Sequence, residues 1–241
     1  MNAVLITGAS RGIGRACAIE LAQSFDAIII NSYTHTENLQ KTKELVESQG
    51  KICYAYPGDI GDYNFVKSMV EDVKNKGITI DLLINNAGIS HVGLLTDMTI
   101  DDWNRILRTN LTSAFNCCKE IVPQMVSNKR GHIINISSMW GLSGASCEVA
   151  YSATKGGLNA FTQALAKELA PSNIAVNAIA CGTIDTSMNA CFSKEDMKQL
   201  ENDIPLGRTG TCEEVALMVR HIYESPLYLT GEVIKFDGGY L

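Results

Sequence analysis

The chain has 241 residues, of which 46% are hydrophobic, and its formal net charge at pH 7 is −6. This length and composition suffice for one large domain with a substantial core, and the acidic balance gives no electrostatic footprint for nucleic acid. The longest apolar runs, such as residues 27–30, are far too short to span a bilayer, and the first residues lack a basic signal-peptide region. We therefore expect a cytoplasmic protein that binds small molecules and has no nucleic-acid or membrane partner.

The 8 cysteines show no metal-site pattern, because none forms a Cys-x-x-Cys pair and no Cys/His cluster has zinc spacing. Several of them stand inside apolar helical patterns, where a free cysteine behaves as a small hydrophobic residue. We expect reduced, buried thiols and no bound metal.

The first element is a predicted strand at residues 3–6, and a glycine-rich turn (TGASRGIG, residues 7–14) leads from it into a helix at residues 15–22. Glycines let the backbone turn tightly and approach a pyrophosphate, and the helix N-terminus offers free N–H groups to the phosphate. This order of strand, turn and helix predicts a nucleotide-phosphate site.

The spacing of these glycines, Gly-x-x-x-Gly-x-Gly, resembles the cofactor motif of the short-chain dehydrogenase/reductase family. The resemblance implies a nicotinamide cofactor, NADPH or NADH, and a hydride-transferring oxidoreductase. It assigns cofactor contacts in this turn to Gly8, Ser10, Arg11, Gly12, Ile13 and Gly14.

The second predicted strand, residues 27–31, bears on the choice of cofactor. In an NAD-preferring site an acidic residue follows this strand and binds the ribose 2′-hydroxyl, but here the position is Ser32. No carboxylate would repel a 2′-phosphate, and Arg11 or Arg15 could approach it. We expect NADPH rather than NADH; alternatively, the two arginines only cover the helix N-terminus.

A helix at residues 36–49, a third strand at 51–56, a helix at 62–75 and a fourth strand at 80–84 follow in order. By resemblance, Asp59 and Ile60 lie at the adenine ring, although Asp59 is equally suited to a turn or helix cap. The segment NNAG at residues 85–88 resembles another motif of the family. Asn86, Ala87 and Gly88 are expected to line the cofactor, unless the asparagines bond only to neighbouring strands.

A long, continuous helix is predicted at residues 101–127. Asn110 lies within it and is expected to have a function without breaking the helix. From the residues alone, Asn110 is a solvated or locally bonded asparagine. The resemblance instead gives it a catalytic role, in which it holds a water that connects a lysine to a proton relay.

The chemistry is expected in the second half of the chain. Ser138 follows the fifth strand (residues 132–136), where ligands bind in open α/β sheets, and Tyr151 and Lys155 share one face of a helix. A nearby ammonium group lowers the pKa of a phenol, so we expect Lys155 to lower that of Tyr151. By resemblance, Tyr151 donates a proton to the substrate oxygen, Ser138 donates a hydrogen bond to it, and Lys155 also binds the nicotinamide ribose.

After the sixth strand (residues 174–179) the family has Pro-Gly, whereas this chain has Cys181 and Gly182, which loosens the turn without removing a catalytic group. Ile184 and Thr186 are expected to contact the nicotinamide carboxamide and the phosphate. Residues 187–211 resemble a substrate lid of short helices. A helix at residues 212–223 and a seventh strand at residues 232–236 follow, and in the family this strand often packs at a subunit interface.

Alternating strands and helices predict one domain over residues 1–241 with a Rossmann-type, doubly wound fold: a seven-stranded parallel sheet with helices on both faces. Residues 1–100 are expected to bind mainly the dinucleotide. Residues 101–241 would carry the catalytic groups, the lid and the interface strand.

Within the family the chain most resembles the bacterial 3-oxoacyl-acyl-carrier-protein reductases of fatty acid biosynthesis, which implies a 3-oxoacyl thioester substrate and a homotetramer. An acidic carrier protein needs a basic docking patch, for which Lys129 and Arg130 are candidates, although a second family position is Ser172. Two alternatives stay open: another alcohol or ketone substrate (a sugar, a steroid or a small metabolite), or a non-catalytic NADP-binding sensor. Candidate substrate-pocket residues follow the relevant strands: Met139, Trp140 and Met188, with His91 and Leu142 beside them.

Overall fold

The structure, a computed structural model, describes residues 1–191 and 193–241, and only the backbone of residues 190, 191 and 194. In this part of the chain, seven strands form one sheet in the order β3-β2-β1-β4-β5-β6-β7, and every pairing is parallel. The strands are β1 (Asn2–Ile6), β2 (Ala27–Ser32), β3 (Ile52–Pro57), β4 (Thr79–Asn85), β5 (Gly131–Ser138), β6 (Ile174–Cys181) and β7 (Val233–Phe236). The order reverses between β1 and β4, so the predicted doubly wound parallel sheet is confirmed.

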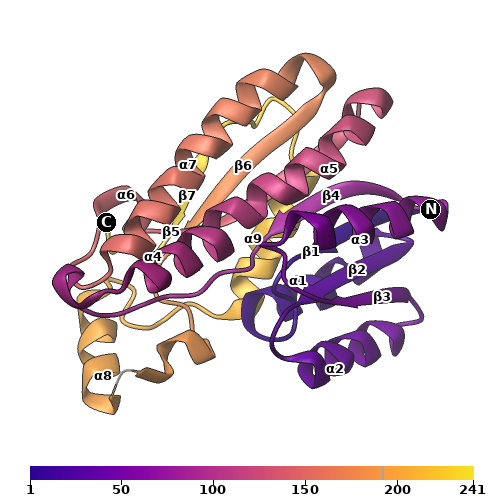
Figure 1. The fold of residues 1–241 in the computed structure, drawn as a ribbon. Helices are drawn as coiled ribbons and strands as arrows, with labels where there is room; N and C mark the ends of the chain where they lie inside the picture. Colours follow the sequence, from indigo (N-terminus) through magenta and orange to yellow (C-terminus); the bar gives the residue numbers. More distant parts are fainter. Residues whose placement is uncertain (192) are drawn as a thin grey trace.

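The α-helices of the described residues alternate with the strands (Figure 1). They are α1 (Gly12–Glu20), α2 (Thr36–Glu47), α3 (Tyr63–Asn75), α4 (Ile100–Leu107), α5 (Ser113–Asn128), α6 (Trp140–Ser143), α7 (Val149–Leu169), α8 (Lys194–Asp203) and α9 (Cys212–Glu224). Short helical turns join them: η1 (Leu21–Ser24), η2 (Leu95–Asp97), η3 (Arg108–Thr112), η4 (Ala170–Ser172) and η5 (Ser187–Cys191).

Two hydrophobic cores cover the two faces of the sheet, because successive side chains of a strand point to opposite faces. Val4 and Ile6 of β1 belong to the core that contains residues of α1, α2 and α9. Ala3 and Leu5 belong to the core that contains residues of α3, α5 and α7. All four side chains are fully buried, as expected for a parallel strand covered on both faces.

The helix predicted at residues 101–127 is interrupted in shape as well, which corrects the sequence interpretation. It is divided into α4 and α5 by η3, a turn of π-helix that contains Asn110. In this turn the Ser113 N–H donates to the Arg108 carbonyl, five residues back instead of four. The asparagine inside the turn bonds to another segment, described below.

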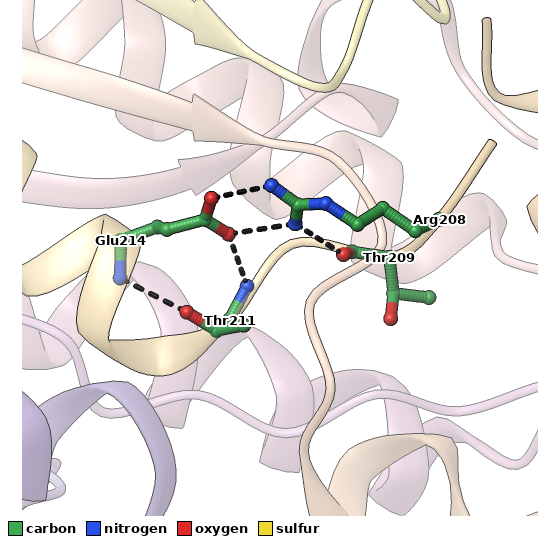
Figure 2. Close-up of polar contacts among 4 residues, drawn as sticks. All are labelled: Arg208, Thr209, Thr211 and Glu214. Atoms are coloured by element: carbon green, nitrogen blue, oxygen red, sulfur yellow. Dashed lines mark hydrogen bonds and ion pairs between the residues drawn. The ribbon is translucent and has the colours of Figure 1, made fainter. Parts of the chain in front are cut away.

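The segment predicted as a lid, residues 187–211, contains the short helices η5 and α8. In Figure 1, α8 lies on the same side of the molecule as α6, away from the N-terminus. Figure 2 shows how the far end of this segment is attached to α9. The Arg208 guanidinium forms two bonds with the Glu214 carboxylate, of 2.6 and 2.9 Å, and donates to the Thr209 carbonyl at 2.9 Å.

The same Glu214 carboxylate accepts the Thr211 N–H at 2.9 Å, and the Thr211 hydroxyl accepts the Glu214 N–H at 3.1 Å. These two bonds form a capping box at the start of α9, so the ion pair fixes the segment to a helix terminus. No helix in the described residues is both long and apolar enough to cross a membrane.

Candidate active site

The glycine turn between β1 and α1 has the backbone that the motif requires. Gly8 and Gly12 have φ of +66° and +57°, a region that residues with a side chain rarely adopt. A Cβ at Gly8 would lie 2.8 Å from the Cα of Ala87, and one at Gly14 would lie 2.5 Å from the Gly8 carbonyl oxygen. The turn therefore needs glycine for its shape and its packing, and it leaves the N-terminus of α1 open to an anion.

Thr7 and Asn86 lock this turn to the end of β4. The Asn86 side chain donates to the carbonyl oxygens of Thr7 and Gly8, at 2.9 and 3.1 Å. The Thr7 hydroxyl accepts the N–H groups of Asn86 and Ala87, both at 3.0 Å. The NNAG segment at residues 85–88 thus holds the glycine turn at residues 7–14 in place.

The two arginines considered for a 2′-phosphate separate in the structure. The guanidinium of Arg15 donates to the Thr42 hydroxyl at 3.0 Å and to the Asn38 carbonyl at 3.2 Å, and also bonds the Ser10 carbonyl. Arg15 therefore ties α1 to α2 and does not line the cavity. Arg11 is exposed and lines the cavity together with Ser32 at the end of β2.

Asp59 makes the turn considered for it and also lines the cavity. Its carboxylate accepts the Gly61 N–H at 2.7 Å, which makes a turn, and pairs with the Arg108 guanidinium at 2.6 Å. Asp59, Ile60 and Arg108 all line the cavity. Arg108, in the π-helical turn η3, therefore lies on the same cavity wall as Asp59, which follows β3.

Asn110 is 2% exposed, and its side-chain amide is occupied by protein groups. It accepts the Ile89 N–H at 2.8 Å and donates to the Ile89 carbonyl at 2.9 Å and to the Thr154 hydroxyl at 3.2 Å. The Thr154 hydroxyl in turn donates to the Tyr151 carbonyl at 2.8 Å. Asn110 thereby joins the segment after β4 to the first turns of α7, without itself lining the cavity.

Ser138, Tyr151 and Lys155 lie together on the cavity wall. Ser138 ends β5, and α7 carries the other two one turn apart. The Lys155 ammonium group lies 5.6 Å from the centre of the Tyr151 ring and donates to the Ile136 carbonyl at 2.7 Å. A hydrogen bond also links the Ser138 hydroxyl with the Tyr151 phenol.

The pKa of the Tyr151 phenol runs against the prediction that Lys155 lowers it. Burial raises this pKa above its usual value of 10.0, the hydrogen bond with Ser138 lowers it, and the negative charge of Glu148 raises it further. Burial also lowers the pKa of Lys155, to about 8. Desolvation is thus the largest influence on both groups, and the phenol remains protonated at neutral pH.

The cavity has a volume of about 1340 Å³ and lies at the carboxyl ends of the strands. The predicted site residues on its wall are Gly8, Ser10, Arg11, Gly12, Ile13, Ser32, Asp59, Ile60, Asn86, Ala87, Gly88, Ser138, Met139, Trp140, Tyr151, Lys155, Ile184, Thr186 and Met188. Gly14 and Asn110 lie behind the wall, and neither His91 nor Leu142 lines it.

The wall also includes Arg108 and Glu148, which had no role in the sequence analysis, and Cys181, which was named there only as a departure from the family. Cys181 is Ser138's partner in the parallel register, and its carbonyl accepts the Met139 N–H at 2.8 Å. The position of Glu148, one helical turn before Tyr151, was the available signal for its place on the wall. Arg108 gave no such signal, because its position depends on the π-helical turn.

The basic pair considered for a carrier protein lies at the other edge of the sheet. Lys129 and Arg130 precede β5, whereas Ser138 ends it, and Ser172 stands just before β6. Arg130 pairs with the buried Asp81 at 3.0 Å. At about 3.3 Å per residue, the 8-residue strand β5 places Arg130 roughly 26 Å from Ser138 of the same chain.

The chain is similar to known proteins over nearly its whole length. The family model for short chain dehydrogenase matches residues 2–197. The chain is 39% identical to a 3-oxoacyl-[acyl-carrier-protein] reductase FabG from Aquifex aeolicus, over 98% of this chain and 95% of the relative. It is 36% identical to the protein of that name from Staphylococcus aureus, over 99% and 97%, and 39% identical to that from Thermotoga maritima, over 98% and 96%.

Proposed function

The chain belongs to the short-chain dehydrogenase family and is an oxidoreductase, and on this premise we propose that it reduces a 3-oxoacyl thioester with NADPH. One observation carries the proposal: Ser138, Tyr151 and Lys155 lie on one cavity with the glycine turn and the end of β2. The names of the relatives supply the substrate class, a 3-oxoacyl group on acyl carrier protein.

The proposed roles follow the geometry. The bound nicotinamide supplies a hydride to the carbonyl carbon of the substrate. Tyr151 donates its proton to the carbonyl oxygen as negative charge develops there, and burial keeps the phenol protonated until then. Ser138 donates a hydrogen bond to the same oxygen and stabilises the developing charge.

Lys155 and Asn110 support this step. Lys155 is charged at neutral pH in spite of its lowered pKa of about 8, and it would bind the nicotinamide ribose beside Tyr151. Asn110 fixes the start of α7 through Thr154, and we retain for it the predicted part in a water path that returns a proton to the site. Gly88 leaves room beside both side chains, since a Cβ there would lie 3.6 Å from each.

NADPH is the proposed cofactor because Ser32, at the end of β2, carries no charge that would repel a 2′-phosphate. Arg11, which lines the cavity with Ser32, is the arginine that could bind that phosphate, since Arg15 is engaged by α2. Ile184 and Thr186 line the same cavity from the segment after β6 and are proposed to contact the nicotinamide carboxamide and the phosphate.

Acyl carrier protein is the proposed partner, but the basic pair before β5 limits how it can dock. A carrier protein at Lys129 and Arg130 would need an arm of roughly 26 Å to reach Ser138 of the same chain, or would serve a neighbouring subunit. The second arrangement requires the predicted homotetramer. The lid role of residues 187–211 and the cytoplasmic location also stay predictions.

The experiment that tests the function follows the loss of NADPH absorbance after addition of a 3-oxoacyl thioester, first on acyl carrier protein and then on a small thiol. We expect turnover with both thioesters and nearly none in Tyr151→Phe, whose NADPH binding should persist. Turnover of other ketones with neither thioester would favour the alternative, a short-chain dehydrogenase for another alcohol or ketone. Bound NADPH without turnover of any carbonyl compound would favour the sensor.

A further inference from the structure

Glu148 is a carboxylate on the cavity wall that the proposed chemistry does not use. It is half-buried, directly precedes α7, and stands one helical turn before Tyr151. Residues three positions apart on a helix are neighbours on one face, so Glu148 and the phenol look into the same part of the cavity. The negative charge of Glu148 is close enough to contribute to the raised pKa of Tyr151.

The described part of the chain offers this carboxylate no partner. Glu148 is the N-cap residue of α7, a position where an acidic side chain commonly accepts a backbone N–H, but its side chain makes no such bond. Among the side chains that the structure describes, which exclude those of residues 190–192 and 194, none forms a hydrogen bond or ion pair with this carboxylate. Burial alone raises the pKa of this carboxyl group.

A half-buried carboxylate that neither caps a helix nor pairs with a cation loses part of its hydration without compensation from the protein. A ligand that places an N–H or O–H group against it would recover that loss, whereas an anionic or purely accepting group would not. The neighbouring wall residues Gly144, Ala145 and Ser146 carry no charge that could take the place of such a donor.

We propose that Glu148 is a specificity-determining residue that accepts a hydrogen bond from a donor group of the substrate near the reacting carbonyl. This inference rests on the proposed function, because in a 3-oxoacyl thioester of a pantetheine-type thiol the first such donor is the amide N–H. That group lies two methylene groups beyond the thioester sulfur. Glu148 therefore selects the thiol arm, while Ser138 and Tyr151 act on the keto group.

The test uses two acetoacetyl thioesters that differ in one atom group. The first carries N-acetylcysteamine, which has the amide N–H, and the second carries 2-acetoxyethanethiol, in which an ester oxygen replaces that N–H. The measured quantity is the ratio of their kcat/KM values. We expect a ratio of about 10 or more in favour of the amide compound in the unchanged protein, as for a hydrogen bond to a charged group.

Glu148→Ala should bring this ratio close to one, and Glu148→Gln, which keeps an acceptor oxygen without the charge, should give an intermediate ratio. Glu168→Ala is the matched control, because Glu168 is an exposed acid at the other end of the same helix, and it should leave the ratio unchanged.

The outcomes separate this inference from the function on which it rests. If both thioesters are reduced and the ratio is the same in the unchanged protein and in Glu148→Ala, Glu148 has no such role although the reductase function stands. If neither thioester is reduced while NADPH binds, the proposed function fails, and the role of Glu148 in thiol-arm selection fails with it.

Discussion

Replacing Lys155 by methionine should stabilise the cofactor-free protein at neutral pH, although Lys155 belongs to the active site. Lys155 is 4% exposed, its ammonium group donates to the Ile136 carbonyl at 2.7 Å, and burial lowers its pKa from 10.5 to about 8. A cationic group whose pKa is lower in the folded state than in the unfolded state destabilises the fold at every pH at which it is charged.

The size of this penalty follows from the difference between the two pKa values. At 1.36 kcal/mol per pH unit, a shift from 10.5 to about 8 corresponds to about 3 kcal/mol of destabilisation below pH 8. The penalty is lost as pH rises through the folded pKa toward 10.5, because the folded protein then binds fewer protons than the unfolded chain. Most of it, about 2–3 kcal/mol, should disappear between pH 7 and pH 10.

The assay is urea unfolding of the cofactor-free protein and of Lys155→Met, at one protein concentration, at pH 7 and at pH 10. The stability advantage of the methionine variant at pH 7 should shrink by about 2–3 kcal/mol at pH 10. The lost bond to Ile136 changes the variant at both pH values, so the difference between them isolates the charge. Lys167→Met, an exposed position on the same helix, should show no such change. An advantage independent of pH would refute the reasoning.

Three further predictions concern the remaining parts of the site. Ser138→Ala should lower kcat by about 10²–10³-fold, because it removes the second donor to the substrate oxygen, while the Kd of NADPH in fluorescence titration stays within a factor of about two. Gly14→Ala should lower the free energy of unfolding by about 1–3 kcal/mol, since its Cβ would lie 2.5 Å from the Gly8 carbonyl oxygen. Gly156→Ala, whose nearest contact is 3.5 Å, should be tolerated in the same urea titration. Arg11→Ala should raise the Kd of NADPH by about tenfold and leave that of NADH nearly unchanged, and equal losses for both cofactors would remove Arg11 from the 2′-phosphate site.

The sequence determined the sheet and the main motifs, because these depend on spacing within short segments. Buried strands separated by helices fix a parallel, doubly wound fold, and the glycine turn needs its glycines wherever it stands. Tyr151 and Lys155 share a helix face because they are four residues apart. Ser138 reaches the same cavity because the carboxyl ends of parallel strands meet at one edge.

Only the tertiary structure decided which groups meet across segments. The sequence could not tell that Arg15 bonds to α2 while Arg11 remains on the cavity, or that a π-helical turn brings Arg108 to Asp59. It placed Lys129 beside β5 without showing that this end of the strand lies far from the site.

The pKa of Tyr151 illustrates the physical reason for this division. Spacing along a helix places an ammonium group one turn away and predicts a lowered pKa, and this much is local. How far water is removed from Tyr151 and Lys155 depends on how β5, β6 and the loop before α7 cover them. This desolvation raises the pKa of Tyr151 where the helical spacing predicts that it is lowered. The sequence predicts which side chains are close together within one helix. Whether those side chains lose their water is decided by the other segments that pack over the helix.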